Sequence, residues 1–567
     1  MKNKKLVAAL MATTVLTTVL AGCAKKPDAA GPKDAAAEMD KDQYLNLFFK
    51  AEPKTMDLSK ATDLYSSQLF QATIEGLTRA ERDKDGKEII AKAGAESWET
   101  SADGLKWTFK LRDHEWSDGQ KVKAGDYVYS LTRTLEPKTA SQYAYFLFSI
   151  KGAEAYNSGK GKKEDVGIKA IDDKTLEFTL NQPVPYFIQL TAFKTFFPQR
   201  EDYVTKYGDK YGTEMETLPV NGPFKMTEWV HQNKVVVEKN DKYWDKDKVK
   251  LNKITYKIIK DENARMNELL NGSLDSAPVA KTEFVEQFKK TGKHTNVTGY
   301  DGSIVYQFYN TKAEVGGQKN PFNSQKVRLA FSLALNREDI VKTLYKGLGS
   351  PALGWVPNEV LIGTDEYRKV VPVEPLKAAQ EKYKDPKALF IEGLKELGLG
   401  EDPSKITIKM INSGTDATQK EFAEYYQQAY QNALGCKIDL EYMEWNQFQK
   451  RTDDGEYQLA GQAWGQDYND PMTFLDMFLS NASQVNNYWK NEKYDKLIND
   501  TRTAKDQAAR AELFKQAEQL LLVDDAVVSP VTYRKFNTFR ANYVKGVMTV
   551  SFGQSELKYA YTQGRGK

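Results

Sequence analysis

The stretch "AESWETSADGLKWTFKLRDHEWSDGQKVKAGDYVYS", residues Ala95–Ser130, combines the pattern of a strand, a turn and a helix. In "LKWTFKLR" the apolar residues Trp107, Phe109 and Leu111 alternate with polar ones, which predicts a strand with one face in a core. "SDG" is typical of a turn. "KAGDYVYSLTRTL" has helical spacing of its apolar residues. The stretch therefore indicates a mixed α/β chain.

The same mixture continues along the chain. "KTLEFTL" (Lys174–Leu180) predicts another strand, and "NGPFKMTEWVHQNKVVVEK" predicts a hairpin that turns at His231-Gln232-Asn233. "KITIKMINSG", a helix from about Gln419 to Leu434, and "CKIDLEYMEW" form a strand–helix–strand unit, which favours a parallel pair. We predict an α/β fold with two or three lobes, because a chain of this length is too long for one core.

The N-terminus has the features of an export signal. Lys2, Lys4 and Lys5 precede an apolar run from Leu6 to Leu20 that is too short for a comfortable membrane span, which needs about 20 residues. "LAGC" follows, ending at Cys23, and resembles the lipobox of bacterial lipoproteins. We predict a signal peptide over residues 1–22 and a lipid on Cys23. An ordinary secretory signal with a chance cysteine is the alternative.

Charge and composition exclude some partners. The chain carries +3, and its first 23 residues hold three lysines and no acids, so the chain from residue 23 is neutral by formal count. A balanced charge argues against a nucleic-acid partner. The small, polar residues after Cys23 predict a flexible tether to about residue 43. With Cys23 lipidated, Cys436 has no disulfide partner.

Known catalytic and metal-binding motifs are absent from the sequence. Its three histidines, His114, His231 and His294, share no ligand spacing. There is no GxSxG elbow, P-loop or GxGxxG. "DYND" lacks the pattern of a calcium loop. We expect no enzymatic activity, no metal and no cofactor, although a buried carboxylate pair would leave no sequence signature.

Three blocks carry a family resemblance: Ala95–Ser130, "NGPFKMTEWVHQNKVVVEKNDKYWD" and "VRLAFSLALNRE". They resemble, in order, the extracytoplasmic solute-binding proteins of family 5, and most of all the oligopeptide-binding proteins of ABC importers. The resemblance runs from about Tyr44 to the C-terminus. It implies a two-lobed periplasmic-binding-protein-like fold (type II, with an extra domain in the first lobe) that encloses its ligand between the lobes.

The resemblance also implies a division of the chain. The predicted parts are the signal peptide (1–22), the lipidated cysteine and tether (23–43), the first part of lobe 1 (44–74), the extra domain of lobe 1 (75–200), the second part of lobe 1 (201–279), lobe 2 (280–533) and a C-terminal return to lobe 1 (534–567).

The stretch "AWGQDYNDPMTFLD", Ala463–Asp476, matches a W-x-x-D-Y-N-x-P pattern of peptide-binding relatives. In them the Asp, here Asp467, accepts the α-ammonium group of the peptide. A buried cation is costly without a counter-charge, and a carboxylate supplies one through a charge-assisted hydrogen bond. The alternatives are that Asp467 caps the helix that begins near Pro471, and that Trp464 is a core residue rather than a pocket wall.

Further ligand-facing residues are implied by the same resemblance. The protein would pair with the peptide backbone as an added strand, with small residues beside Trp464 leaving the main chain approachable. The implied peptide-binding residues are Asp467, Trp464, Ala463, Gly465, Tyr468, Tyr143, Trp445, Thr62, Asp63 and Leu64. Some short-peptide binders carry an Arg where this chain has Gly461, so the C-terminus of the ligand is either uncapped or met by a lysine.

The sequence thus predicts a lipid-anchored, monomeric receptor that captures extended oligopeptides and delivers them to an ABC permease with its ATPases. It would lie on the extracytoplasmic face of a bacterial membrane, as on a Gram-positive surface. The alternatives are a receptor of the same fold for a peptide pheromone, a nickel chelate or an oligosaccharide, and an enzyme or adhesin on this scaffold.

Overall fold

The computed structural model describes residues 38–482, 484–550 and 554–566. The chain divides into two compact units, Met1–Glu38 and Met39–Lys567, and the second contains all the elements below. The predicted signal peptide, Cys23 and most of the tether lie outside the described residues.

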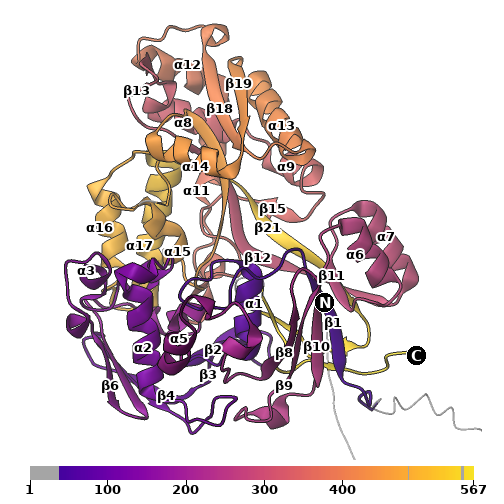
Figure 1. Cartoon of the computed structure of the whole chain (residues 1–567). Helices are drawn as coiled ribbons and strands as arrows, with labels where there is room; N and C mark the ends of the chain where they lie inside the picture. Colours follow the sequence, from indigo (N-terminus) through magenta and orange to yellow (C-terminus); the bar gives the residue numbers. More distant parts are fainter. Residues whose placement is uncertain (1–37, 483, 551–553, 567) are drawn as a thin grey trace, which may run out of the picture. The chain divides into compact units, whose positions relative to one another are not determined.

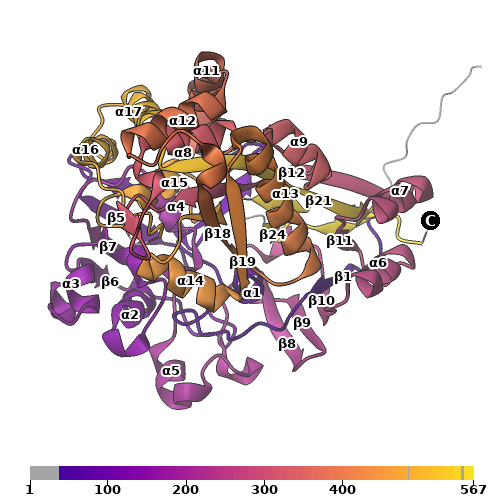
Figure 2. The same ribbon diagram turned by 90° about the horizontal axis from the view of Figure 1, so that it is seen from above.

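The largest sheet has seven strands in the order β11-β21-β12-β20-β18-β19, with β15 also paired to β21. Its strands are β11 Ser276–Pro278, β12 His294–Tyr309, β15 Gly349–Pro351, β18 Thr407–Ser413, β19 Lys437–Met443, β20 Leu459–Gly465 and β21 Val528–Ala541. The long strands β12 and β21 run antiparallel and side by side (Figures 1 and 2). They join the part of the sheet near β11 to the part that contains β18 and β19.

The predicted strand–helix–strand unit is confirmed. Strands β18 and β19 are parallel along their whole length, and helix α13 (Ala417–Leu434) connects them. The side chain of Asp416 accepts hydrogen bonds from the first turn of α13, and Gly435 ends the helix at a φ of 80°. A glycine adopts this left-handed conformation without the penalty of a Cβ.

The stretch Ala95–Ser130 forms the expected strand, turn and helix. Strand β5 (Lys106–Leu111) lies in an antiparallel sheet of order β4-β5-β7-β6, and helix α2 (Ala124–Leu135) follows the turn. Phe109 and Leu111 are buried, and Trp107 packs against Phe187. The other strands are β4 Ala95–Thr100, β6 Ile168–Asp172 and β7 Thr175–Thr179.

A third sheet has the order β1-β10-β9-β8. It contains β1 Tyr44–Phe49, β8 Phe224–Val230, β9 Lys234–Lys239 and β10 Lys253–Ile258. Strands β8 and β9 are the predicted hairpin, and Gln232 in its turn has a φ of 60°.

Helices cover these sheets, and short two-stranded pairs lie in the connecting segments (Figure 1). The remaining helices are α1 Leu64–Thr73, α3 Ala153–Asn157, α4 Phe187–Leu190, α5 Glu201–Tyr207, α6 Glu262–Leu270, α7 Thr282–Thr291, α8 Gln325–Leu333, α9 Arg337–Thr343, α10 Tyr367–Val370, α11 Pro375–Lys382, α12 Pro386–Glu396, α14 Trp445–Asp454, α15 Met472–Leu475, α16 Glu492–Asp500 and α17 Gln507–Gln519. The strand pairs are β2 Thr78–Arg82 with β3 Glu88–Lys92, β13 Glu314–Val315 with β14 Gln318–Lys319, β16 Leu361–Ile362 with β17 Asp365–Glu366, β22 Val544–Lys545 with β25 Tyr561–Thr562, and β23 Met548–Val550 with β24 Gln554–Glu556.

Burial of apolar side chains holds the elements together. One continuous cluster of buried residues extends from β1 to the C-terminal strands, and a smaller one lies between α6, α7 and β21. Within the residues that the structure describes, no helix combines the length and apolarity that a membrane span requires.

Candidate functional site

Strand β20 carries the centre of the site, and one of its edges is open. Strand β12 pairs with β20 along its whole length, from Leu459 to Gly465. On the other edge, β18 pairs with Leu459 and Ala460 alone. Among the described residues, no strand pairs with that edge from Gly461 to Gly465. The N–H and C=O groups of an unpaired edge are a template for an added strand.

The residues on one face of β20 along this open edge have small side chains or none. Residues two apart share a face of a strand, so Gly461, Ala463 and Gly465 project together. A Cβ added at Gly461 would meet its nearest neighbour at 3.6 Å, and one at Gly465 at 4.0 Å, so neither glycine is enforced by crowding. The small side chains leave the backbone of β20 approachable.

A cavity of about 670 Å³ lies beside the open edge and contains Gly461, Ala463 and Trp445 in its wall. Trp445 is the first residue of α14, is 49% exposed and stacks on Phe448 with ring centroids 5.7 Å apart. The predicted partners Ala463 and Trp445 are therefore brought together.

Three cations line the same cavity: Lys346, Arg534 and Lys535. Arg534 pairs with Asp301 at 3.0 Å, and the Lys535 ammonium lies 4.8 Å from the ring centroid of Tyr300. Lys346 has no carboxylate within ion-pair distance among the described residues. The sequence offered no signal for these residues, because they come from segments far from β20.

Asp467 lies in the loop between β20 and α15, and it does not cap that helix. The carboxylate at the helix start is that of Asp470, which precedes the N-cap residue Pro471 and whose Oδ1 accepts a hydrogen bond from the Met472 amide at 2.9 Å. Asp470 also receives two hydrogen bonds of 2.6 Å from the buried Arg510. The prediction that Asp470 is nearer the helix start, which leaves Asp467 spare, is confirmed.

The carboxylate of Asp467 has one neutral partner. The hydroxyl of Tyr145 donates to Oδ2 at 3.2 Å. Burial raises the pKa of Asp467 to about 6, and the Tyr145 hydrogen bond offsets only part of that effect. No cation neutralises this carboxylate among the described residues. The group is therefore desolvated and ready to accept a positive charge.

Aromatic side chains and further charged groups surround Asp467. The Trp464 indole N–H donates to Thr473 O at 3.0 Å, and Tyr468 stacks on Tyr186 with centroids 4.7 Å apart. Trp464, Asp467 and Tyr468 line one cavity of about 270 Å³. Tyr145, Asp476 and Arg502 line it as well. Burial raises the pKa of Asp476 to about 7.

Tyr145 is a functional candidate that sequence reasoning missed. The stretch "TASQYAYF" contains both Tyr143 and Tyr145, and the resemblance selected Tyr143. The half-buried Tyr143 packs on Tyr145, and the ammonium of Lys194 lies 4.7 Å from its ring centroid. A short 3-10 helix, Ala144–Leu147, decides which tyrosine reaches Asp467, and its orientation has no local sequence signal.

The segment Thr62–Leu64 begins helix α1. Asp63 is the N-cap, and its Oδ1 accepts a hydrogen bond from the Ser66 amide at 2.9 Å. Leu64 is 52% exposed and lines a different cavity from Asp467. The structure therefore gives Asp63 a structural role and leaves the predicted ligand contact of this segment a prediction.

Comparison with known proteins gives a consistent result. Residues 90–486 match the family described as bacterial extracellular solute-binding proteins, family 5. The chain is 35% identical to the oligopeptide-binding protein OppA of Bacillus subtilis, over 99% of this chain and 100% of that one. It is 34% identical to the dipeptide-binding protein DppE of the same organism, over 96% and 97%.

Solved structures share the fold as well. The structure of Listeria monocytogenes OppA bound to peptide has a TM-score of 0.72 and 33% identity, and covers 92% of this chain and 99% of that one. The predicted periplasmic-binding-protein-like fold is confirmed. This chain belongs to the bacterial extracellular solute-binding proteins of family 5.

Proposed function

We propose that this protein is the substrate-binding component of an ABC importer and captures extended oligopeptides. The open edge of β20 and the uncompensated carboxylate of Asp467 carry this proposal. The edge offers hydrogen bonds that any peptide backbone can make, and the carboxylate offers a counter-charge for an α-ammonium group. The related proteins named above bind oligopeptides or dipeptides, according to their names.

The geometry suggests a direction for the peptide. Asp467 follows the C-terminal end of β20, so a peptide whose ammonium group meets Asp467 would run back from Gly465 towards Gly461, antiparallel to β20. Its later residues would enter the cavity that contains Trp445 and Lys346. Lys346 is then the candidate lysine for the peptide C-terminus, which is one of the two alternatives that Gly461 leaves open.

Tyr145 suggests what contacts Asp467 when no peptide is bound. Its hydroxyl occupies one acceptor position of Asp467, at 3.2 Å. A phenol is neutral, so an ammonium group would replace it with a charge-assisted bond, which is roughly twice as strong. The aromatic wall of Trp464 and Tyr468 would exclude water from that contact.

Anchoring and delivery complete the proposal. Cys23 would carry a lipid that holds the protein at the extracytoplasmic face of a bacterial membrane, and a permease with its ATPases would receive the peptide. The neutral chain after residue 22 is compatible with a tether rather than an electrostatic attachment. Metabolic labelling with a fatty-acid analogue, in wild type and Cys23→Ser, tests the anchor directly.

Native mass spectrometry of the purified body tests the binding function. We expect a spread of bound peptides with free N-termini. Asp467→Asn should lose them, while Asp439→Asn, an exposed carboxylate on β19, should keep them. Acetylation of the α-amine of a released peptide should abolish its rebinding. Retention of peptides by Asp467→Asn would overturn the role of Asp467, and a non-peptide ligand would overturn the function.

A further inference from the structure

A third cavity, of about 330 Å³, lies apart from Asp467 and from the open edge of β20. Residues of β1, α1, β11 and β21 form much of its wall, and others come from β8, β10, β23, β24 and the segment after β24. Lys50, Gln68 and Arg540 supply polar groups, and Phe224 and Tyr256 are apolar parts of the wall. A volume of this size can hold a small organic ligand or a large side chain.

Arg540 lies in β21 and has almost no partners. Its Nη1 donates to Val547 O at 3.5 Å, the limit of a hydrogen bond. Its Nε is buried and has no acceptor among the described residues. No carboxylate of the described residues pairs with it, and burial lowers its pKa without any acid to offset the effect. A guanidinium group has five donors, so most of its hydrogen-bonding capacity is unused.

Two buried arginines of this protein have more partners than Arg540 has. Arg510 makes a two-bond contact with Asp470, although its Nε, like that of Arg540, has no acceptor among the described residues. Arg337 has no acid partner, yet it donates to the carbonyls of Pro530 and Ser332 and to two serine hydroxyls. Within the part of the chain that the structure describes, Arg540 has neither an acid nor a set of carbonyls as partners. A carboxylate of a ligand would supply acceptors for the donors of this guanidinium group.

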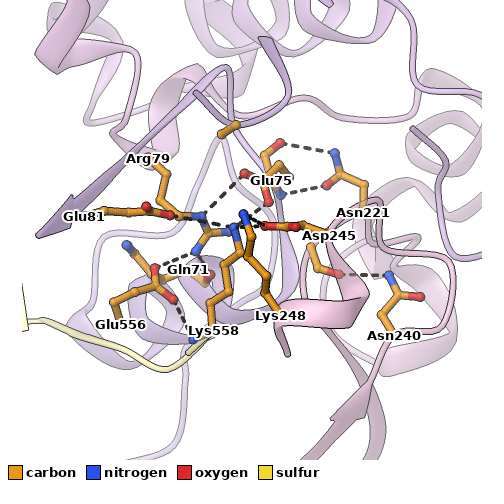
Figure 3. Close-up of polar contacts among 12 residues, drawn as sticks. Gln71, Glu75, Arg79, Glu81, Asn221, Asn240, Asp245, Lys248, Glu556 and Lys558 are labelled. Carbon is orange, nitrogen blue, oxygen red and sulfur yellow. Dashed lines mark hydrogen bonds and ion pairs between the residues drawn. The ribbon is translucent and has the colours of Figure 1, made fainter. Parts of the chain in front are cut away.

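The acid in the wall of this cavity, Glu556, already has partners of its own. Glu556 lines the cavity, but its Oε2 accepts a 2.6 Å bond from Arg79 and its Oε1 accepts the Lys558 amide at 2.8 Å. Figure 3 shows Glu556 turned towards Arg79, in a network with Glu75 and Lys558. Glu556 therefore does not serve as the counter-ion of Arg540.

We propose that this cavity is an anion-binding site in which Arg540 holds a carboxylate. Lys50, which has no acid partner among the described residues, adds positive charge at the wall. The carboxylate has two possible sources: an acidic side chain of the bound peptide, or a free small carboxylate. The first source rests on the proposed function and the second does not.

The position of Leu64 supports the first source, an acidic side chain of the bound peptide. It lines this cavity and belongs to the segment predicted to face the peptide. The chain neighbours Lys535 and Phe536 line the two cavities on either side of β21, Lys535 the one beside β20 and Phe536 this one. Both cavities therefore adjoin β21, and the first source requires a peptide side chain that extends past this strand to Arg540.

Two measurements distinguish the sources, each on wild type and on Arg540→Met, with Arg451→Met on α14 as the matched control. The first is the shift of the thermal midpoint with increasing succinate. The second is the calorimetric affinity for peptide pairs that differ by Glu or Gln at one position. If the site takes a free carboxylate, succinate raises the midpoint of wild type saturably and not that of Arg540→Met.

If the acidic side chain is the ligand, one Glu peptide binds wild type about tenfold more tightly than its Gln counterpart, and the two bind Arg540→Met equally. The proposal is overturned if wild type shows neither the succinate shift nor the preference for a Glu peptide, or if Arg540→Met keeps both effects. Arg540→Lys, which preserves charge but not the guanidinium fork, should retain a weakened response if Arg540→Met does not fold. Succinate binding without any peptide binding would refute the proposed function and leave this site standing.

Discussion

At the scale of single residues, the charge state of Asp467 sets the pH range of binding. Its pKa of about 6 in the free protein lies below that of a peptide α-amine, about 8. Both partners are charged between these values. We expect affinity to fall about tenfold per pH unit below 6, as Asp467 becomes neutral, and to fall again above 8. Calorimetry from pH 4.5 to 9 measures this profile, and a flat acidic limb would contradict it.

The raised pKa of Asp467 also predicts a cost to stability. The native carboxyl keeps its proton up to about pH 6, whereas the unfolded one releases it near its ordinary value of 3.8. Stability is therefore lost as pH rises through this window. We expect Asp467→Asn to raise the free energy of unfolding by about 1–2 kcal/mol at pH 7 and to change it little at pH 3.5. Denaturant melts at the two pH values test the difference.

Gly461 is a second residue whose replacement is informative. A side chain fits there because the nearest atom to a built Cβ is 3.6 Å away. Gly461→Arg would place a cation in the cavity beside Lys346, where it can pair with a peptide carboxylate. We expect the bound population to shift towards shorter peptides, as native mass spectrometry would show. Gly461→Gln is the neutral control, and an equal shift in both variants would argue for volume rather than charge.

At the scale of elements, substitutions at the start of helix α1 can show whether Asp63 caps the helix or binds the ligand. Asp63 caps the helix through the Ser66 amide and also accepts the Ser66 hydroxyl at 2.6 Å. We expect Asp63→Ala to lower the free energy of unfolding by about 1 kcal/mol, and Asp63→Ser to retain most of the stability because serine is also a good cap. Peptide affinity, measured alongside, should be similar in both. A large loss of affinity in Asp63→Ser alone would instead support a ligand contact.

At the scale of the whole molecule, the C-terminal segment is tied to the body by buried charges. Glu556 and Lys558 reach Arg79, Glu81 and Asp245 (Figure 3). Breaking one partner of a buried pair leaves an uncompensated charge, which typically costs 3–5 kcal/mol. Glu75 still pairs with Arg79, so we expect Glu556→Gln to cost about 2–3 kcal/mol in denaturant unfolding. The exposed pair Lys496–Asp500 is the control, and Asp500→Asn should change stability by less than about 0.5 kcal/mol.

Much of this architecture could be predicted from local sequence. Alternation in β5, the turn residues of the β8–β9 hairpin and the capped helix α13 each have a short-range physical signature, and the structure confirms all three. The family resemblance extended these predictions to the fold and to Asp467. The predicted lobe boundaries, Cys23 and the peptide contacts stay predictions.

The sequence by itself determined the elements, the family and the candidate role of Asp467, whose carboxylate does not cap the next helix. It could do so because propensity, capping and motif spacing act over a few residues. The tertiary structure alone decided which edge of β20 stays open, that Tyr145 rather than Tyr143 contacts Asp467, and that no acid among the described residues pairs with Arg540. The first two features depend on groups that are far apart in the chain, by 322 residues for Tyr145 and Asp467. Folding brings them together and removes their water, and desolvation is what raises the pKa of Asp467 and leaves Arg540 unsatisfied.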